Sequence, residues 1–568
     1  MATLTQLASS ALVAYSLLGC GAKIGGGVDV DADEPCVTGV QRCTENTLES
    51  CSDGSWTTSQ ECTGVCSPAL GCVTCIPGTG TCSGDTATTC RVDGSGFDDI
   101  ACDPDIGISC SGGSCQGACA PATLGRSYIG CEYFPTVTAQ AVSTDFSYSV
   151  VISNTGGVPA QVRIEGGALA APLTLTVAPQ EVKVQDLPWV PALKICNGGG
   201  MNGCTNPNAF VVGQVTNGSY HLKSTQPVTV YQFSPKDYTN GASFTFTNDA
   251  SLLLPTNAMT GNYVVASYPF WNQFNYPGLM AVTAVRDNTT VTITPTAPSS
   301  GTPTFPVGVA TPVVLQKGDV IQILNTSGDL TGSKVSADKP VQVIGGHYCT
   351  NVPSNVVACD HLEESMFPTE TLSTEYLVTA PAVPSIPNGK EEVIRIIAIE
   401  ANTNLTYDPP LPSAPTTIPN AGGYAQIARQ PGDYKITADK RIMIAQYMEG
   451  QAAGGNTGDP AMTLTVAIDQ YRSEYLFHAP TNYVTNYVNV TAPTGATVML
   501  DGTAIADWTP IGNSGFSVAR VVLGAGPLND GSHSATSSDP FGISVYGYGD
   551  YTSYWYPGGL NLDAIVVD

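Results

Sequence analysis

The chain has 568 residues, a length that predicts three to five folded units, and 42% hydrophobic residues, which excludes global disorder. Its 60 glycines and 41 prolines exclude an all-α fold, because both residues destabilise the interior of helices. A net charge of −26 excludes nucleic acid as a partner, since a nucleic-acid-binding protein needs a basic surface.

Residues 7–19 form an apolar run that ends directly before Cys20. The run is too short to span a bilayer, and the letters LLGC at its end resemble a bacterial lipobox, whose cysteine carries lipid after signal cleavage. We therefore expect residues 1–20 to act as a lipoprotein signal peptide. We expect the lipid on Cys20 to be the sole membrane contact, and Gly21 favours the outer membrane and cell surface. Because residues 1–10 contain no Lys or Arg, a secreted protein and a different start codon stay open.

The cysteine count also favours a lipid on Cys20. Of 19 cysteines, 18 remain without it, and they fall into even-numbered local groups. Even groups at short spacing predict disulfide bonds formed in an oxidising compartment. Twelve of the 18 lie between residues 36 and 115. The pairs predicted beyond them are Cys119 with Cys131, Cys196 with Cys204, and Cys349 with Cys359.

An acidic tether at residues 21–35 precedes two cysteine repeats at residues 36–119. The six cysteines of the first repeat are 7, 8, 11, 4 and 6 residues apart, and those of the second are 7, 8, 12, 8 and 5 apart. A unit of about 40 residues buries too little apolar surface to fold without cross-links. Only Cys72 and Cys75 have the Cys-x2-Cys spacing of a zinc-ribbon knuckle, and they straddle the boundary between the repeats, so a pair of such knuckles is missing. We predict a disulfide-rich stalk.

Residues 120–568 consist of short alternating stretches rich in Val, Ile, Thr and Tyr, which are separated by turn residues. A strand signature recurs about every 100 residues, and a strand that begins with Tyr follows it. The signature occurs at Gln226, Lys339, Lys440 and Asp539, and the Tyr-led strands begin at Tyr263, Tyr376 and Tyr475. We predict an all-β fold of about four tandem sandwich-like modules, with a propeller-like arrangement as the alternative.

The stretch HYCTNVPSNVVACDHLEE combines a predicted disulfide loop with two of the five histidines and three carboxylates. Imidazole and carboxylate groups bind divalent metals, so one hypothesis is a site for calcium or another divalent ion. Its ligands would be His347, Asp360, His361, Glu363 and Glu364. The alternative is that these polar groups satisfy buried backbone or face water. No other cofactor is expected.

This stretch carries the motif Gly-His-x-Cys followed by Cys-Asp-His-Leu-x-Glu. Together with SYIGCEYFPTVT from Ser127, DASLLLPT from Asp249 and PFGISVYGYGDYTSYWYPGG from Pro540, it resembles the IgGFc-binding protein N-terminal domain family. The resemblance covers residues 127–568, and the cysteine stalk resembles those of predicted myxobacterial surface lipoproteins. The resemblance to this family implies a secreted, non-catalytic recognition module. Antibody binding belongs to the animal namesake, so the resemblance implies an extracellular partner without naming it.

Two aromatic clusters are candidates for stacking on sugars or on a protein partner. One lies in SYPFWNQFNYPG and the other near the end of the chain. Tyr and Trp are also common in the cores of β-sandwiches, which is the alternative interpretation. The candidate binding aromatics are Trp271, Phe274, Tyr551, Trp555 and Tyr556.

The chain contains no nucleophile elbow, phosphate loop or dinucleotide-binding motif, so we expect no enzymatic activity. The leading hypothesis is a cell-surface lipoprotein that recognises or adheres to an extracellular protein or glycan. One alternative is an envelope structural protein whose modules assemble with copies of themselves. A third is a carbohydrate-active hydrolase, because that chemistry needs only two carboxylates at the right separation.

Overall fold

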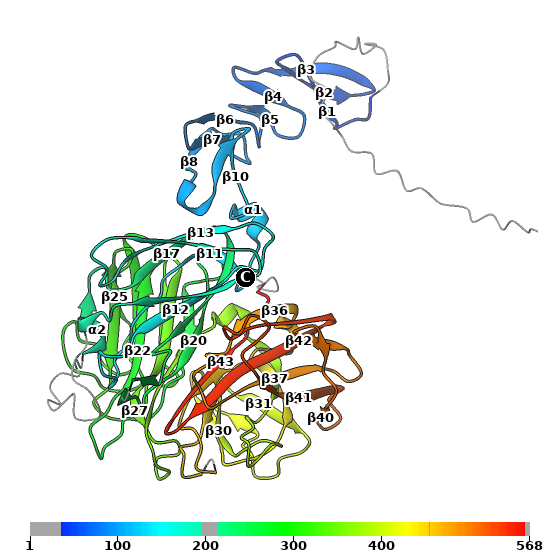
Figure 1. The fold of residues 1–568 in the computed structure, drawn as a ribbon. Coiled ribbons are helices and arrows are strands. Elements are labelled where there is room, and N and C mark those ends of the chain that lie inside the picture. The colour runs from blue at the N-terminus through cyan, green and yellow to red at the C-terminus, as the bar shows by residue number, and fades with distance from the viewer. Residues whose placement is uncertain (1–35, 196–210, 212, 242, 454, 563–568) are drawn as a thin grey trace, which may run out of the picture. The chain divides into compact units, whose positions relative to one another are not determined.

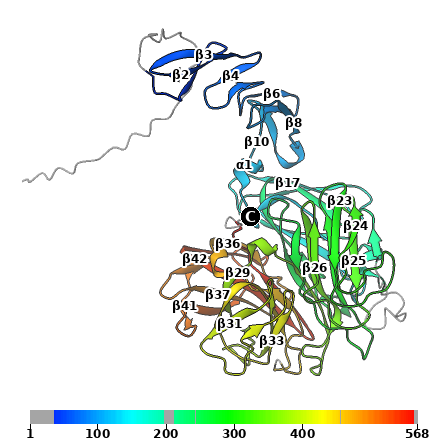
Figure 2. The ribbon, with the colours of Figure 1, turned by 180° about the vertical axis from the view of Figure 1, so that it is seen from behind.

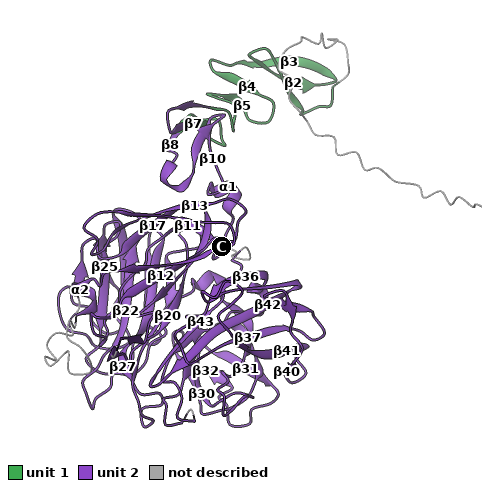
Figure 3. Ribbon diagram, in the orientation of Figure 1, with its two compact units in different colours: residues 1–80, 89–98 green, residues 81–88, 99–568 purple. Residues whose placement is uncertain are grey.

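The computed structural model describes residues 36–195, 211, 213–241, 243–453 and 455–562. These residues form two compact units (Figure 3), one with residues 36–80 and 89–98 and the other with residues 81–88 and 99–562. Strands make up nearly all of the regular structure, which confirms the predicted all-β fold. In this part of the chain, no helix is long and apolar enough to cross a membrane.

The two cysteine repeats have the same disulfide connectivity. In each repeat the first cysteine bonds to the third, the second to the fifth and the fourth to the sixth. The bonds are Cys36–Cys51, Cys43–Cys66 and Cys62–Cys72 in the first repeat, and Cys75–Cys90, Cys82–Cys110 and Cys102–Cys115 in the second. Both repeats are therefore versions of one small cross-linked unit.

Short strands make up these repeats, and the helix α1 follows them. The elements of the first repeat are β1 (Gln41–Thr44), β2 (Thr47–Ser52), β3 (Ser55–Glu61), β4 (Val65–Ser67) and β5 (Gly71–Val73). Those of the second are β6 (Gly80–Ser83), β7 (Thr86–Cys90), β8 (Phe97–Ala101), the 3-10 helix η1 (Pro104–Ile106), β9 (Ser109–Ser111) and β10 (Ser114–Gln116), followed by α1 (Pro121–Leu124).

Beyond α1 the described chain folds into four sandwich modules that share seven strands in the same order, which we call a to g (Figure 1). In the first module these are β11 (Gly130–Tyr133), β12 (Tyr148–Ser153), β13 (Ala160–Gly166), β14 (Leu173–Val177), β15 (Val182–Leu187), β17 (Tyr220–Phe233) and β20 (Ala250–Leu253). In the second they are β21 (Asn262–Val264), β22 (Gly278–Ala284), β23 (Thr289–Thr294), β24 (Thr311–Leu315), β25 (Val320–Leu324), β26 (Lys334–Ala337) with β27 (Val341–Thr350), and β28 (Asp360–Ser365).

The third and fourth modules repeat this order. The third has β29 (Ser373–Val378), β30 (Glu392–Ala398), β31 (Thr403–Asp408), β32 (Thr417–Ile418), β33 (Tyr424–Ala428), β34 (Tyr434–Met448) and β35 (Met462–Leu464). The fourth has β36 (Arg472–His478), β37 (Thr485–Pro493), β38 (Val498–Leu500), β39 (Thr503–Ala504), β41 (Phe516–Leu523), β42 (Ser532–Gly549) and β43 (Thr552–Pro557). Short additions are α2 (Pro191–Lys194), β16 (Gly213–Val215), β18 (Thr239–Asn240), β19 (Ser243–Phe244), η3 (Thr369–Thr371), η4 (Ile468–Gln470) and β40 (Thr509–Pro510).

Strand f belongs to both sheets of its module. Its first half pairs with strands a and c, and its second half pairs with strands b and g. The repeated sequence signature lies in the middle of strand f, where the chain passes from one sheet to the other. In the second module strand f is interrupted at Pro340, between β26 and β27, whereas Pro227 and Pro540 lie within the continuous strands β17 and β42.

A buried tyrosine in strand a fixes that strand to strand f in every module. Its hydroxyl donates to the carbonyl oxygen just after the Pro or Arg of the signature. The four bonds run from Tyr133 to Val228 (2.6 Å), Tyr263 to Val341 (2.8 Å), Tyr376 to Ile442 (2.7 Å) and Tyr475 to Phe541 (2.5 Å). The tyrosine recurs because each hydroxyl satisfies a backbone carbonyl that is buried away from water.

The four g strands lie together in the centre of the second unit. Strand β20 contacts β28 and β43, and β35 contacts the same two strands, so the fourth module closes a ring against the first. The largest hydrophobic cluster contains residues from all four g strands, among them Ala250, Leu362, Met462 and Tyr554. Figures 1 and 2 show the first two modules, in cyan and green, beside the last two, in yellow to red. The modules are thus two-sheet sandwiches around a shared centre, not four-stranded propeller blades.

Candidate functional site: the f–g loops

The connections between strands f and g lie together at one end of the ring. They cover residues 234–241 with 243–249, 351–359, 449–453 with 455–461, and 550–551. The amides of Gly450 and Ala452 donate to the carbonyl oxygens of Val352 (2.9 Å) and Val357 (2.8 Å), which joins the third connection to the second. The second and third connections are therefore continuous. We call the surface formed by all four connections the f–g face.

The fourth connection also joins this surface. The amide of Tyr551 donates to Oε1 of Gln451 in the third connection at 2.8 Å. The hydroxyl of Thr552, directly after it, donates to Oδ1 of Asn248 in the first connection at 3.0 Å. The short turn of the fourth module thus links the connections of the first and third modules.

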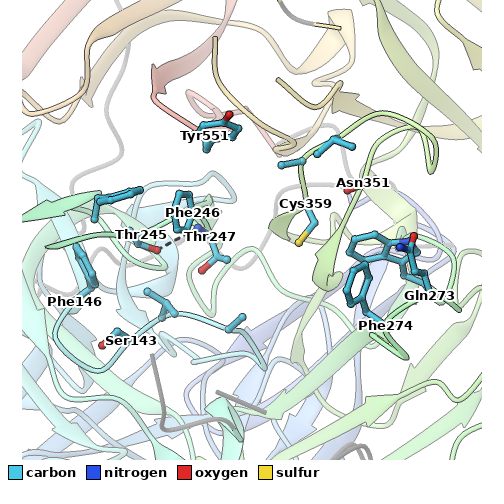
Figure 4. A pocket seen from close by; sticks show the side chains of 16 residues that line it. Ser143, Phe146, Thr245, Phe246, Thr247, Gln273, Phe274, Asn351, Cys359 and Tyr551 are labelled. Carbon is cyan, nitrogen blue, oxygen red and sulfur yellow. Dashed lines mark hydrogen bonds between the residues drawn. The ribbon is translucent and has the colours of Figure 1, made fainter. Parts of the chain in front are cut away.

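A cavity of about 550 Å³ opens in the f–g face (Figure 4). The f–g connections of the first, second and fourth modules line it, together with the a–b connections of the first and second modules. The lining residues are Ala141, Val142, Ser143, Phe146, Phe244, Thr245, Phe246, Thr247, Trp271, Gln273, Phe274, Asn351, Val357, Ala358, Cys359 and Tyr551. Loops on a rigid β scaffold commonly carry binding residues, so this cavity is the candidate functional site.

Aromatic rings on opposite walls dominate the cavity. On one wall, Phe246 lies 4.6 Å from Phe244 and 6.1 Å from Tyr551, between ring centroids. On the other wall, the rings of Trp271 and Phe274 are 4.5 Å apart. The exposed fractions are 52% for Phe244, 37% for Phe246, 42% for Phe274 and 40% for Tyr551. Exposed apolar rings that gather at one place mark an interaction site, whereas single exposed rings do not.

The polar groups that line the cavity are uncharged hydroxyls and amides. They belong to Ser143, Thr245, Thr247, Gln273, Asn351 and Tyr551, and Trp271 adds an indole N–H. None of the described lining residues carries a charge, and the thiol of Cys359 is not free, because it is bonded to Cys349. The cavity therefore suits an uncharged, largely apolar group, with a few hydrogen-bonding positions at its wall.

The structure brings together three of the five predicted binding aromatics. Trp271, Phe274 and Tyr551 all line the cavity. The prediction is wrong for Trp555 and Tyr556, which are fully buried in β43. Strand β43 lies in the centre of the ring, where both of its faces are covered, and the hydroxyl of Tyr556 donates to the carbonyl oxygen of His478.

Sequence reasoning missed three lining phenylalanines, Phe146, Phe244 and Phe246. The last two lie in the letters NGASFTFTND, where two rings alternate with Thr between turn residues. Such alternation on a short exposed hairpin is a signal that sequence reasoning could have used.

The predicted metal ligands are buried in the core, and they bond to protein groups. Glu363 accepts hydrogen bonds from the Thr138 hydroxyl at 3.0 Å and from the Gln232 amide at 3.1 Å. Glu364 accepts from the amide of Leu252 at 3.1 Å, and Asp360 accepts from the amide of His361 at 2.7 Å. The bonds of Gln232 and Leu252 join β28 to strands β17 and β20, and the other two satisfy polar groups within the core, as in the alternative interpretation.

His347 is held in the same way. Its Nδ1 accepts from the Cys349 amide at 3.1 Å and its Nε2 lies 3.2 Å from the Pro269 carbonyl oxygen. Burial lowers its pKa to about 3. Among the described residues, no group of three or more His, Cys, Asp or Glu side chains is placed to hold a metal ion. The metal hypothesis thus gains no support from the geometry.

Asp249, at the start of the motif DASLLLPT, bonds to all four g strands. Its carboxylate accepts from the amides of Ala250 (2.9 Å), Glu363 (3.0 Å), Met462 (3.1 Å) and Trp555 (3.3 Å). Burial raises the pKa of Asp249 well above its ordinary value, although hydrogen bonds from the backbone oppose that shift. This side chain holds the centre of the ring next to the f–g face.

Two of the predicted cysteine pairs beyond the stalk are bonded in the structure, Cys119–Cys131 and Cys349–Cys359. The second bond closes the loop that forms one wall of the cavity. The predicted pair Cys196 and Cys204 and the predicted lipid site Cys20 lie outside the described residues.

Eight disulfide bonds in the described residues and the tandem sandwich modules define an extracellular or secreted β protein. The family model described as IgGFc binding protein matches residues 249–547, which is more than half of the chain, so the chain belongs to this family. The human protein named IgGFc-binding protein is 27% identical over 315 residues. The match covers 54% of this chain but only 6% of the human protein. The predicted family is confirmed, and its most specific motif spans the loop between β27 and β28.

Proposed function

We propose that this chain is a non-catalytic recognition module that binds an extracellular protein through the cavity of the f–g face. The gathering of exposed aromatic rings around that cavity carries the proposal. Aromatic side chains are enriched at the energetic centres of protein interfaces, because they bury a large apolar area at low entropic cost. The printed name of the human relative, an IgGFc-binding protein, supports a protein as the partner.

The chemistry of the cavity favours binding over catalysis. General acid–base or nucleophilic catalysis needs a titratable or nucleophilic side chain within reach of the substrate. The described lining residues offer hydroxyls and amides and no free thiol, and they include no carboxylate, imidazole or amine that could activate a hydroxyl as a nucleophile. A glycan also needs many hydrogen-bonding partners, and the largely apolar wall suits a protein side chain better.

An array of extracellular proteins and glycans, probed with the oxidised chain, tests this proposal. We expect capture by specific proteins and loss of that capture in the variant Phe246→Ala. Phe97→Ala is the matched control, since Phe97 is 48% exposed in β8, outside the cavity. Binding to glycans alone, or equal loss in both variants, would contradict the proposal. Self-association in light scattering without any capture would favour the structural alternative.

We also propose that lipid on Cys20 holds the protein in the outer membrane, at the cell surface. Residues 21–35 would act as a tether and residues 36–119 as a stalk. The apolar run before Cys20 and the disulfide-rich repeats support this arrangement. Mass spectrometry of the protein purified from membranes would show an acylated peptide that begins at Cys20. The variant Cys20→Ser should be released into the medium.

A further inference from the structure

The cavity of the f–g face is large enough to hold more than a single side chain of a partner. Its volume of about 550 Å³ lies within the range of roughly 300–1,000 Å³ that is typical of ligand sites. Its lining is uncharged, so an ionised group placed deep inside would lose its hydration without gaining a partner. The group that enters the cavity is therefore neutral and apolar.

The exposed charges next to the lining residues are negative. Asp145 is exposed, and the hydroxyl of Ser143, a lining residue, donates to its Oδ2 at 2.9 Å. Asp550 is exposed and directly precedes Tyr551. Its Oδ1 accepts from Nε2 of Gln451 at 3.4 Å, and that side chain also holds the Tyr551 amide. Both carboxylates thus belong to segments that shape the cavity.

In the described part of the chain, no lysine forms an ion pair with Asp145 or Asp550. Lys194 is fully buried behind the wall, where its ammonium donates to the carbonyl oxygen of Val142 at 2.5 Å. Lys236, on the first f–g connection, is paired with Asp237. The whole chain carries a net charge of −26, which adds a long-range attraction for cations.

From these observations we propose that the f–g cavity binds a basic segment of the partner protein, which inserts an apolar side chain between Phe246 and Trp271. This inference rests on the proposed function and names the chemistry of its partner. Lysine or arginine residues that flank the inserted side chain stay at the rim. There they meet Asp145 and Asp550, and the exposed ring faces of Phe244 and Tyr551 attract cations as well.

Calorimetric titration of the full oxidised chain with three short peptides tests the inference. The peptides are Lys-Lys-Phe-Leu-Lys-Lys, its acidic counterpart Glu-Glu-Phe-Leu-Glu-Glu, and Lys-Lys-Ser-Ser-Lys-Lys, which lacks the apolar anchor. We expect the first to bind at least about tenfold more tightly than either of the others, because it supplies both the anchor and the charge.

Two variants and their controls assign the contributions. Phe246→Ala should weaken binding of the first peptide by about tenfold or more, because it removes the central ring. The double variant Asp145→Asn with Asp550→Asn should weaken binding and reduce its dependence on salt. Phe97→Ala and Asp507→Asn, both at exposed positions away from the cavity, should leave the affinity unchanged.

The outcomes separate this inference from the proposed function. Equal binding of the basic and acidic peptides, or no binding of any peptide, overturns the inference. Even then, Phe246→Ala can still abolish capture of a protein on the array. That result would support the proposed function and show that only the inferred chemistry of the partner is wrong. If Phe246→Ala affects neither assay, both proposals fail.

Discussion

Single side chains join strands that are far apart in the sequence, and the recurrent tyrosines show why particular residue types are needed. The hydroxyl of Tyr376 in β29 donates to the carbonyl oxygen of Ile442 in β34 and accepts from the Ser373 amide at 3.0 Å. Phenylalanine would fill the same volume but leave both backbone groups unpaired. This explains why strand a of each module contains a tyrosine and not another aromatic residue at this position.

The variant Tyr376→Phe should therefore lower the free energy of unfolding by about 1–3 kcal/mol, the cost of leaving buried polar groups without partners. Tyr551→Phe is the control, because its ring is 40% exposed and we expect no comparable change. Chemical denaturation of both variants measures the difference. Equal stability of the two variants would contradict the role assigned to the Tyr376 hydroxyl.

Asp459, in the third f–g connection, should make stability depend on pH. Burial raises the pKa of Asp459 from 3.8 to about 8. Lys390 interacts electrostatically with this carboxyl, and burial lowers the pKa of Lys390 to about 8. The folded state holds the proton of Asp459 more tightly than the unfolded state does. The protonated carboxyl therefore contributes fully to the free energy of unfolding below about pH 4. That contribution is lost as the pH rises through 8.

The variant Asp459→Asn should consequently gain stability relative to the wild type between pH 4 and pH 8, by on the order of 1 kcal/mol per pH unit. Denaturation curves at pH 4, 6 and 8 give this difference, in which the other titrating groups largely cancel. Asp507→Asn, at an exposed position, is the matched control. A pH-independent difference for Asp459→Asn would show that its carboxylate is not held protonated.

At the scale of elements, the sequence predicts the repeated strands well and the connections poorly. The signatures at Gln226, Lys339 and Lys440 mark the middle of strand f, because the same bend between two sheets recurs in each module. The f–g connections have different lengths and no shared pattern, so no repeat could show that they meet. The sequence also could not predict the burial of Trp555, since the sequence pattern of an aromatic-rich strand is the same whether one or both of its faces are covered.

The loop closed by Cys349–Cys359 should matter for binding more than its contribution to stability suggests. The bond spans 10 residues of sequence, which corresponds to roughly 3 kcal/mol in the chain-entropy model. Its loop supplies Asn351, Val357 and Ala358 to the cavity wall. Replacing both cysteines by serine should lower stability by a similar amount and weaken binding of the basic peptide about tenfold.

The bond Cys119–Cys131 provides the matched control, because it spans 12 residues and lies away from the cavity. Its double serine variant should lose comparable stability and keep the peptide affinity. Thermal melts and titrations of both double variants provide the comparison. Equal loss of affinity in the two would mean that stability, and not the shape of the loop, controls binding.

At the scale of the whole β region, the fourth module closes the ring. The hydroxyl of Tyr231 in the first module donates to the carbonyl oxygen of Gly558 at 2.8 Å, and its ring lies 4.7 Å from that of Tyr556. Asn561 forms a bridge with Ser127, just before strand a of the first module. A repeat of about 100 residues predicts modules but not whether they form an open string or a ring. That distinction depends on contacts between modules that share no sequence signal.

Ring closure makes the four modules depend on one another for folding. A chain that ends at residue 470 would lose β43 and expose the apolar residues of β20 and β35 that it covers. We expect this variant to lose its cooperative unfolding transition and to bind no peptide. Deletion of residues 36–72, the first cysteine repeat with its own three bonds, should leave the melting temperature and peptide affinity unchanged. Near-ultraviolet circular dichroism measures the unfolding transitions of both variants, and calorimetry measures their peptide affinities. A three-module chain that melts at the temperature of the full protein would show that each sandwich folds on its own, because the contacts at the centre would then add no stability to the other modules.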